Sequence, residues 1–219
     1  MAGGRGERLR PLTDKTPKPL LSVGRKPLIE ELMDEFDKQG FGKFTLCLGY
    51  KADLIQKHFE TGFHRWDIDY VVEKNPLGTG GPLNLLPEFD EPFIVCNSDI
   101  RAYIDYTSLM SRHNTSDALM TVCTALYQHQ IPYGVMDSTG LDLVLREKPI
   151  ENFAVNAGVY VLDPRARKYA PDGRFDMTDL VTALAEDRKV ATYPLQGYWE
   201  DVGHFEDRAR LRDDWDERP

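Results

Sequence analysis

The sequence lacks any hydrophobic run that approaches membrane-spanning length, and no signal peptide precedes its first glycines. It has only three cysteines, Cys47, Cys96 and Cys123, which stand alone in apolar runs without metal-ligand spacing. It also has no excess of basic residues: the net charge is −9, which argues against general nucleic-acid binding. We therefore expect a cytoplasmic protein with reduced core cysteines, and neither nucleic acid nor membrane as a partner.

The charge is distributed unevenly along the chain. Residues 1–26 carry seven basic and two acidic side chains, so the remainder is strongly acidic. An acidic body with one basic stretch suits a small anionic ligand that binds at one place. A basic loop exposed to solvent would give the same balance, so charge alone does not decide between the two.

The basic stretch contains a glycine-rich loop. Gly3, Gly4 and Gly6 lie within four positions, and the backbone N–H groups of such a turn can form a concave anion site. A Walker loop would need Gly-Lys-Ser/Thr here, but Glu7 and Arg8 follow Gly6. A dinucleotide fingerprint would need a glycine three residues after Gly6, where a leucine stands. The loop thus predicts a polyphosphate site of another kind, or a simple glycine turn.

Hydrophobic periodicity predicts an α/β fold. Helices at 27–39 and 51–59 alternate with strands at 43–48 and 67–72, which is typical of a parallel sheet with helices on its faces. Further along, we expect a helix around Leu83–Leu86, a strand at 92–96 and a strand-rich second half. We interpret residues 1–219 as a single domain with two halves, 1–115 and 116–219.

Two aspartates follow predicted strands far apart in the sequence. Asp99 comes just after the apolar strand 92–96, and Asp201 lies in the segment Trp199–Gly203. Carboxylates at strand ends can hold Mg²⁺, a hard cation that prefers oxygen ligands and phosphates. Each aspartate has a structural alternative: Asp99 as a turn former, and Asp201 as the N-cap of a helix predicted at 204–215.

The opening of the chain resembles that of the sugar nucleotidyltransferases. Their pattern Ala-Gly-Gly-x-Gly-x-Arg-Leu-x-Pro-Leu-Thr, followed by Pro-Lys-Pro, is matched at every fixed position from Ala2 to Pro19. The resemblance implies a Rossmann-like, mixed but mainly parallel sheet with helices on both faces, the nucleotide-diphospho-sugar transferase fold. It also implies that Ala2, Gly3, Gly4 and Gly6 contact the nucleotide, and that Arg8 and Lys18 neutralise its phosphates.

Later segments match further motifs of this family in the family's order. The resemblance implies that a second glycine loop holds the nucleobase through Glu73, Pro76, Gly78 and Thr79. It implies that Asp99 and Asp201 are the Mg²⁺ ligands, although Ser98 replaces the glycine that usually precedes the first. It implies a sugar-phosphate site made by Tyr133, Gly134, Glu147, Lys148, Asn156 and Gly158. The resemblance thus implies a nucleotide-binding half at 1–115 and a sugar-phosphate-binding half at 116–219.

The reaction implied is transfer of a nucleotidyl group from an NTP to a sugar 1-phosphate, giving an NDP-sugar and pyrophosphate. The sequence leaves the base and the sugar open, with GTP slightly favoured over UTP, and it leaves a homo-oligomer open. One alternative is a non-catalytic relative that binds nucleotide sugars as a regulator. Another is an enzyme with a different phosphorylated acceptor, such as phosphocholine.

In this family an apolar strand normally precedes Ala-Gly-Gly, but here only Met1 does so. We expect this first strand to be missing, with a gap beside the strand at 43–48 or another segment filling it. We also expect the natural polypeptide to continue upstream with apolar residues.

Overall fold

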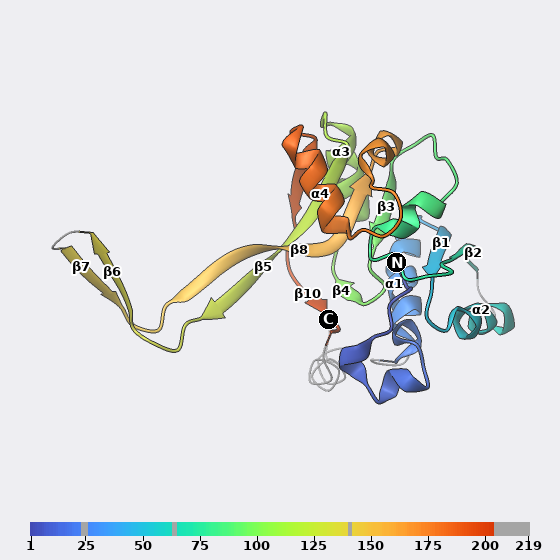
Figure 1. The fold of residues 1–219 in the computed structure, drawn as a ribbon, viewed down its shortest axis with the longest axis horizontal. Helices are drawn as coiled ribbons and strands as arrows, with labels where there is room; N and C mark the ends of the chain where they lie inside the picture. Colours follow the sequence, from blue (N-terminus) through green and yellow to red (C-terminus); the bar gives the residue numbers. More distant parts are fainter. Residues whose placement is uncertain (23–25, 63–64, 140–141, 204–219) are drawn as a thin grey trace.

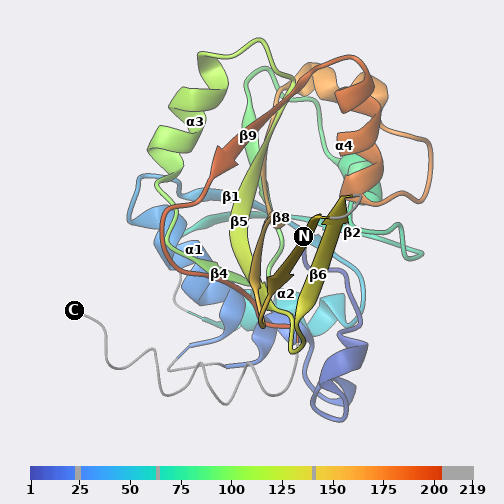
Figure 2. The same ribbon diagram turned by 90° about the vertical axis from the view of Figure 1, so that its left-hand side faces the viewer.

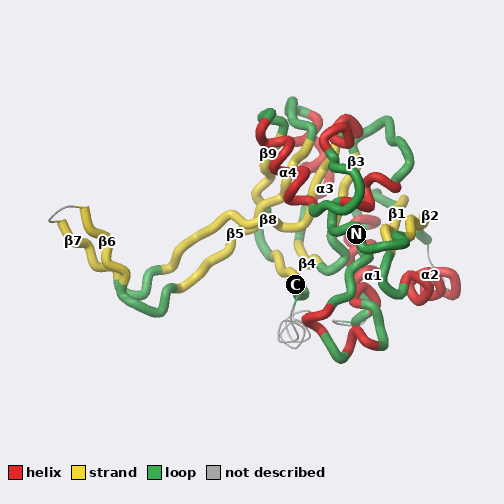
Figure 3. Tube along the Cα trace, viewed as in Figure 1, coloured by secondary structure: helices red, strands yellow, loops and turns green. Residues whose placement is uncertain are grey.

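The computed structural model describes residues 1–22, 26–62, 65–139 and 142–203. Short 3₁₀ turns lie between the main elements (Figures 1 and 3). The helices are α1 (Leu28–Asp37), α2 (Ala52–Thr61), α3 (Tyr106–Asn114) and α4 (Met177–Glu186). The strands are β1 (Lys43–Leu48), β2 (Asp67–Val72), β3 (Phe93–Cys96), β4 (Ile100–Ala102), β5 (Met120–Gln130), β6 (Val135–Thr139), β7 (Asp142–Arg146), β8 (Ile150–Leu162), β9 (Val190–Pro194) and β10 (Trp199–Asp201).

The first part of the chain confirms the predicted alternation of helices and strands. β1 and β2 pair in parallel over the predicted residues, from Lys43 opposite Asp67 to Leu48 opposite Val72. α1 begins after Pro27, which suits the first position of a helix. Its apolar face includes Ile29 and Met33, which pack with β1 and α2.

A four-stranded sheet in the order β3-β8-β5-β9 forms the second part. Side chains alternate between its two faces, as the period of a strand requires. Tyr160 and Leu162 of β8 pack in the cluster that contains α4, whereas Val159 and Val161 pack in the cluster that contains α3. Figure 2 shows α3 and α4 on opposite sides of this sheet.

The expected gap lies between β1 and β3. Of the residues that the structure describes, only Met1 and Ala2 lie between these strands. Ala2 N–H donates to the Cys47 carbonyl at 2.8 Å, and the Met1 ammonium donates to the Cys96 carbonyl at 2.7 Å. Ser98 N–H donates in turn to the Met1 carbonyl at 3.1 Å. A cavity of about 480 Å³ lies between β1 and β3, where the rest of an interior strand would run.

This gap also changes the expected sheet. The mixed α/β class is confirmed, but the described strands form four small sheets, and only the β1–β2 and β5–β9 pairs are parallel. The strand pairs β3–β8, β5–β8, β4–β10 and β6–β7 are antiparallel. Among the described residues no complete strand lies between β1 and β3, and the β1–β2 sheet stays separate from the four-stranded sheet.

One predicted helix is wrong. The segment expected to be helical around Leu83–Leu86 forms only a short 3₁₀ turn, η4 (Gly81–Leu85). Gly80, Gly81 and Pro82 stand at its start, and consecutive glycines have the lowest helix propensity apart from proline. The helix predicted at 204–215 lies outside the described residues.

A long β-arm projects from the body (Figure 1). We define the arm as residues 126–154: the outer ends of β5 and β8 followed by the β6–β7 hairpin. β9 pairs with β5 only up to Thr124, and β3 pairs with β8 only from Val159, so the outer ends of β5 and β8 pair with each other alone. In the hairpin, β6 and β7 pair antiparallel from Val135 opposite Arg146 to Thr139 opposite Asp142.

Two further observations concern the chain as a whole. Across the described ranges, no helix has the length and apolar character that crossing a membrane requires. Cys47, Cys96 and Cys123 are all free thiols, as the sequence predicts.

Candidate active site

The glycine loop folds around Gly6. Gly6 has φ +61°, in the left-handed region, and directly precedes the 3₁₀ turn η1 (Glu7–Leu9). Thr13 Oγ1 donates to the Gly6 carbonyl at 2.9 Å, and an added Cβ at Gly6 would lie 2.8 Å from Thr13 Cγ2. Only glycine combines this backbone conformation with this close approach. The loop therefore takes a fixed shape, held by Thr13.

The two predicted carboxylates lie side by side. β4 and β10 pair antiparallel with Ile100 opposite Asp201, and Val202 N–H donates to the Asp99 carbonyl at 3.0 Å. This short ladder brings together residues that are about a hundred positions apart. Lys18 joins them from the loop segment: its Nζ is 2.5 Å from Asp99 Oδ2 and 3.8 Å from Asp201 Oδ1.

Burial makes this triad more than a surface ion pair. The Lys18 side chain is 14% exposed and the Asp99 side chain 26%, while Asp201 is about half exposed. Partial burial strengthens the attraction between opposite charges relative to water. The triad thus lies at the wall of a cleft, with its carboxylate oxygens gathered around one cation.

That cleft has a volume of about 510 Å³, within the usual range for a small-molecule site. Its lining includes every residue that the sequence analysis assigned to the nucleotide or to catalysis. These are Ala2, Gly3, Gly4, Gly6, Arg8, Lys18, Glu73, Pro76, Gly78, Thr79, Asp99 and Asp201.

The second glycine loop is fixed by contacts with the start of α4. Gly78 has φ +81°, and an added Cβ there would lie 2.4 Å from the Phe175 carbonyl oxygen. Thr79 N–H donates to Asp176 Oδ1 at 2.8 Å, and the Thr79 hydroxyl accepts from Met177 N–H at 3.0 Å. The Thr79 hydroxyl therefore holds the loop to α4, and Gly78 and Thr79 are among the residues that line the cleft.

Glu73 lies at the junction of the two loops. It follows β2, its Oε2 accepts the Leu77 N–H at 2.7 Å, and its Oε1 lies close to Gly3. A carboxylate held in this way between Gly3 and Leu77 is an acceptor at the cleft wall. It can accept hydrogen bonds from N–H groups of a nucleobase.

The predicted sugar-phosphate residues do not line this cleft. Asn156 and Gly158 lie on β8 near it: Asn97 N–H donates to the Gly158 carbonyl at 3.0 Å. Asn156 makes contacts within β8, donating to the Tyr160 hydroxyl at 2.8 Å and accepting from Gly158 N–H at 3.0 Å. The other four residues, Tyr133, Gly134, Glu147 and Lys148, all lie on the arm.

The cleft residues that the sequence analysis did not assign include Asn97 and Arg174. Asn97 follows β3 directly. Arg174 precedes Phe175, and the Phe175 carbonyl accepts the N–H groups of Gly80 and Gly81 at 3.0 and 3.1 Å. Arg174 adds a third cation to a wall that already holds Arg8 and Lys18. Asn97 stands two residues before Asp99 and could have been suspected from that position, but no sequence signal points to Arg174.

The donor set fits a hard divalent cation bound together with phosphates. Mg²⁺ in nucleotide sites usually takes one or two carboxylates and completes its shell with phosphate and water oxygens. Among the described residues no group of three or more His, Cys, Asp or Glu side chains could form a protein-only metal site. Asp99 and Asp201 thus suit a metal that arrives with a nucleotide.

The cysteines near the cleft are not nucleophiles. Burial raises the pKa of Cys96 to about 12, and burial also raises the pKa of Cys47, which lines the cleft. Both thiols therefore stay protonated near neutral pH, and a thiol is a poor nucleophile compared with its thiolate.

Comparison with known proteins identifies the class. A family model described as nucleotidyl transferase matches residues 1–216, so the chain belongs to the nucleotidyl transferase family. Two similar curated proteins are the mannose-1-phosphate guanyltransferases of Schizosaccharomyces pombe and Debaryomyces hansenii, at 31% and 32% identity over 94% of this chain. The chain spans 61% of the length of each.

Solved structures agree on the fold. HddC from Yersinia pseudotuberculosis superposes with a TM-score of 0.76 and 25% identity, covering 98% of this chain and 96% of that one. A putative glucose-1-phosphate thymidylyltransferase from Bacillus anthracis gives the same TM-score at 20% identity, over 100% of this chain and 94% of that one. The predicted nucleotide-diphospho-sugar transferase fold is confirmed.

Proposed function

We propose that the chain transfers a guanylyl group from GTP to a sugar 1-phosphate. The observation that carries this proposal is the triad of Lys18, Asp99 and Asp201 at the wall of the cleft that both glycine loops line. The choice of guanine and of a sugar 1-phosphate rests on the similarity to mannose-1-phosphate guanyltransferases. The sequence motifs favour the same class.

The reaction needs positioning and charge neutralisation rather than a covalent intermediate. A phosphate oxygen of the sugar 1-phosphate attacks the α-phosphorus of GTP in line, the bond to the β-phosphate bridging oxygen breaks, and pyrophosphate leaves. Arg8 and Lys18 neutralise the triphosphate, and Arg174 lies where it can add to this. Backbone N–H groups of the first glycine loop donate to the phosphates.

Asp99 and Asp201 would hold a Mg²⁺ ion, which when bound neutralises the charge that develops on the phosphate oxygens. Without it, the two carboxylates would repel an incoming triphosphate. Lys18 offsets part of that repulsion, because its ammonium lies between them. The second glycine loop and Glu73 would bind the base.

The two halves of the chain would divide the substrates. Residues 1–115 supply both glycine loops, Lys18 and Asp99, and we assign the nucleotide to them. Residues 116–219 supply Asp201 and the arm with Lys148, and we assign the sugar phosphate to this half. We infer a cytoplasmic location from the three reduced cysteines.

A substrate screen tests this proposal. Pyrophosphate release is measured with each of five NTPs against a panel of sugar 1-phosphates, with mannose 1-phosphate among them. We expect GTP to give the highest kcat/KM and the product to be a GDP-sugar. Pyrophosphate release with GTP but with phosphocholine as the only effective acceptor would overturn the assignment of the acceptor. No release with any pair would overturn the proposed activity.

A further inference from the structure

Lys18 makes two kinds of contact that belong to different steps of the proposed reaction. Its ammonium lies 2.5 Å from Asp99 Oδ2 and 3.8 Å from Asp201 Oδ1. Its stem lies against the first glycine loop, because a Cβ built at Gly6 would be 3.2 Å from Lys18 Cβ. The side chain therefore starts beside the proposed phosphate site and ends at the proposed metal ligands.

The backbone that carries Lys18 is fixed, while its side chain is flexible. Lys18 begins a 3₁₀ turn and stands between Pro17 and Pro19, whose rings set the φ angles on either side of it. Leu21 N–H closes the turn by donating to the Lys18 carbonyl at 3.0 Å. A lysine carries its charge on a flexible stem of four carbons. From this fixed root, the ammonium can change partners by rotation of the side chain alone.

Asp99 and Asp201 are held together by backbone contacts and share one ammonium. Ile100 pairs with Asp201 in the β4–β10 ladder, and Val202 N–H donates to the Asp99 carbonyl. Two carboxylates brought together in a cleft repel each other. The Lys18 ammonium, on a side chain that is only 14% exposed, offsets that repulsion. Lys18 thus supplies to these aspartates the positive charge that a metal ion would also supply.

A metal ion on the same carboxylates would compete with this ammonium. Mg²⁺ binds carboxylate oxygens at about 2.1 Å, so an ion on Asp99 Oδ2 would lie no more than roughly 4.6 Å from the present position of Lys18 Nζ. At that separation, charges of +2 and +1 repel enough to weaken metal binding about twentyfold, even with the dielectric constant of bulk water. The repulsion grows in a partly buried cleft, where the effective dielectric constant is lower.

We propose that Lys18 excludes free metal ions from Asp99 and Asp201, and that it gives up these carboxylates only to a metal that arrives with a nucleotide. The ammonium then moves to the triphosphate, whose negative charge lies beside the first glycine loop. This second step rests on the proposed function, since it needs a triphosphate in the cleft. The exclusion of free metal rests on the contacts of Lys18 alone. The cleft therefore selects the metal–nucleotide complex over the free metal ion.

The first test titrates Mn²⁺ into the protein without nucleotide, at low ionic strength, and follows the free ion by electron paramagnetic resonance. Mn²⁺ suits the same carboxylate oxygens as Mg²⁺. Lys18→Met replaces the lysine by an uncharged, flexible side chain, and we expect it to bind Mn²⁺ about tenfold or more tightly than wild type. Lys18→Arg keeps the charge and should bind Mn²⁺ as weakly as wild type.

Two controls place the effect at these carboxylates. Lys15→Met removes an exposed lysine of the same basic stretch, which is not among the described residues that line the cleft. Its affinity for Mn²⁺ should differ from that of wild type by less than about twofold. Adding Asp99→Asn to Lys18→Met should abolish the gain. If Lys18→Met binds Mn²⁺ no more tightly than wild type, or if Lys15→Met gains as much, the proposal is wrong.

Thermal unfolding gives an independent readout of the same exclusion. Lys18→Met removes the ammonium from two neighbouring carboxylates, so its Tm should lie below that of wild type and should rise when millimolar Mg²⁺ is added. The wild-type Tm should not respond to Mg²⁺ alone. A wild-type Tm that rises with Mg²⁺ as much as that of the variant contradicts the exclusion.

The second step is tested by calorimetric titration of GTP in the presence of Mg²⁺ and without an acceptor. If the ammonium moves to the triphosphate, Lys18→Met should bind GTP about tenfold more weakly than wild type, and Lys15→Met should match wild type. Equal affinities for Lys18→Met and wild type would mean that the ammonium stays with the carboxylates, and the second step would be wrong. If wild type releases no pyrophosphate with any substrate pair, the proposed function fails, whereas the Mn²⁺ titrations still decide the exclusion of free metal.

Discussion

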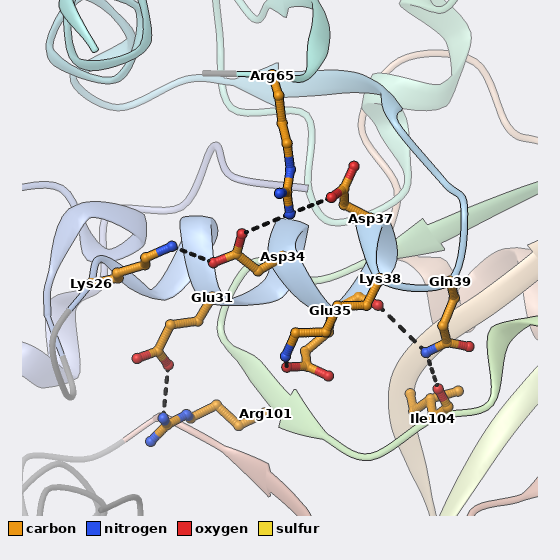
Figure 4. A network of polar contacts seen from close by, with 10 residues as sticks. All are labelled: Lys26, Glu31, Asp34, Glu35, Asp37, Lys38, Gln39, Arg65, Arg101 and Ile104. Carbon is orange, nitrogen blue, oxygen red and sulfur yellow. Dashed lines mark hydrogen bonds and ion pairs between the residues drawn. The ribbon is translucent and has the colours of Figure 1, made fainter. Parts of the chain in front are cut away.

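Glu31 and Arg101 form a buried ion pair, and the loss of folding stability on breaking it can be estimated from the structure. Figure 4 shows Glu31 projecting from α1 toward Arg101 of β4. Arg101 Nη2 lies 2.7 Å from Glu31 Oε2, and the two side chains are only 3% and 10% exposed. Because β4 also pairs with β10, this contact holds α1 to the ribbon that ends in Asp201.

Glu31→Ala would remove the Glu31 carboxylate from its contact with the buried Arg101 guanidinium. Removing one partner of a buried pair costs about 3–5 kcal/mol, whereas replacing both partners by apolar residues is often nearly neutral. For a chain of this size about 1 kcal/mol corresponds to roughly 2–4 °C in Tm, so the Tm should fall by about 6–20 °C. The double variant Glu31→Leu/Arg101→Met should recover much of that loss.

Thermal unfolding followed by circular dichroism measures these shifts. Arg10→Ala is the matched control: it removes an arginine from an ion pair with Asp14 in which both side chains are more than half exposed, at 56% and 54%. A pair this exposed contributes about 0–1 kcal/mol, so the control should lose only a few degrees at most. A Tm for Glu31→Ala equal to that of the control, or a double variant no more stable than the single one, would refute the reasoning.

Three further predictions concern the site and one buried histidine. Asp99→Asn and Asp201→Asn should each lower turnover by orders of magnitude with an unchanged circular dichroism spectrum, and near wild-type rates at saturating Mg²⁺ would contradict the metal assignment. Lys18→Ala should mainly impair use of GTP, and Lys148→Ala use of the sugar 1-phosphate. Steady-state kinetics with each substrate varied measures the two effects. If both variants impair the use of GTP and of the sugar 1-phosphate equally, the assignment of the two lysines to different substrates is wrong. Burial lowers the pKa of His113 below its ordinary value of 6.5, so the unfolded state binds more protons and stability should fall as the pH drops below 6.5. His113→Gln should flatten that fall in denaturant titrations, and an unchanged slope would count against it.

Much of the fold could be predicted because its signals are local. The strands at 43–48 and 67–72 follow from apolar residues of strand length, and the structure has them at the same bounds. The helix after Pro27 follows from its apolar stripe. Around Leu83 the leucine spacing suggested a helix, but the glycines and proline before it outweighed that pattern.

The site was predictable only in part. The residues of the two glycine loops and both aspartates could be assigned from motifs, and all of them line one cleft. Arg174 could not, because its place depends on how the segment before α4 packs against the second glycine loop. The direction of the arm could not be predicted either, because a strand pattern does not say whether a ribbon lies on the body or leaves it.

The most direct measurement uses GTP with sulfur in place of one α-phosphate oxygen, supplied as a single stereoisomer, together with mannose 1-phosphate. The product is identified by mass spectrometry, and the configuration at its α-phosphorus is determined. Direct in-line transfer predicts a thio-GDP-sugar with inverted configuration. Retention of configuration would contradict attack without a covalent enzyme intermediate, and absence of any GDP-sugar, also with unmodified GTP, would contradict the guanylyl transfer itself.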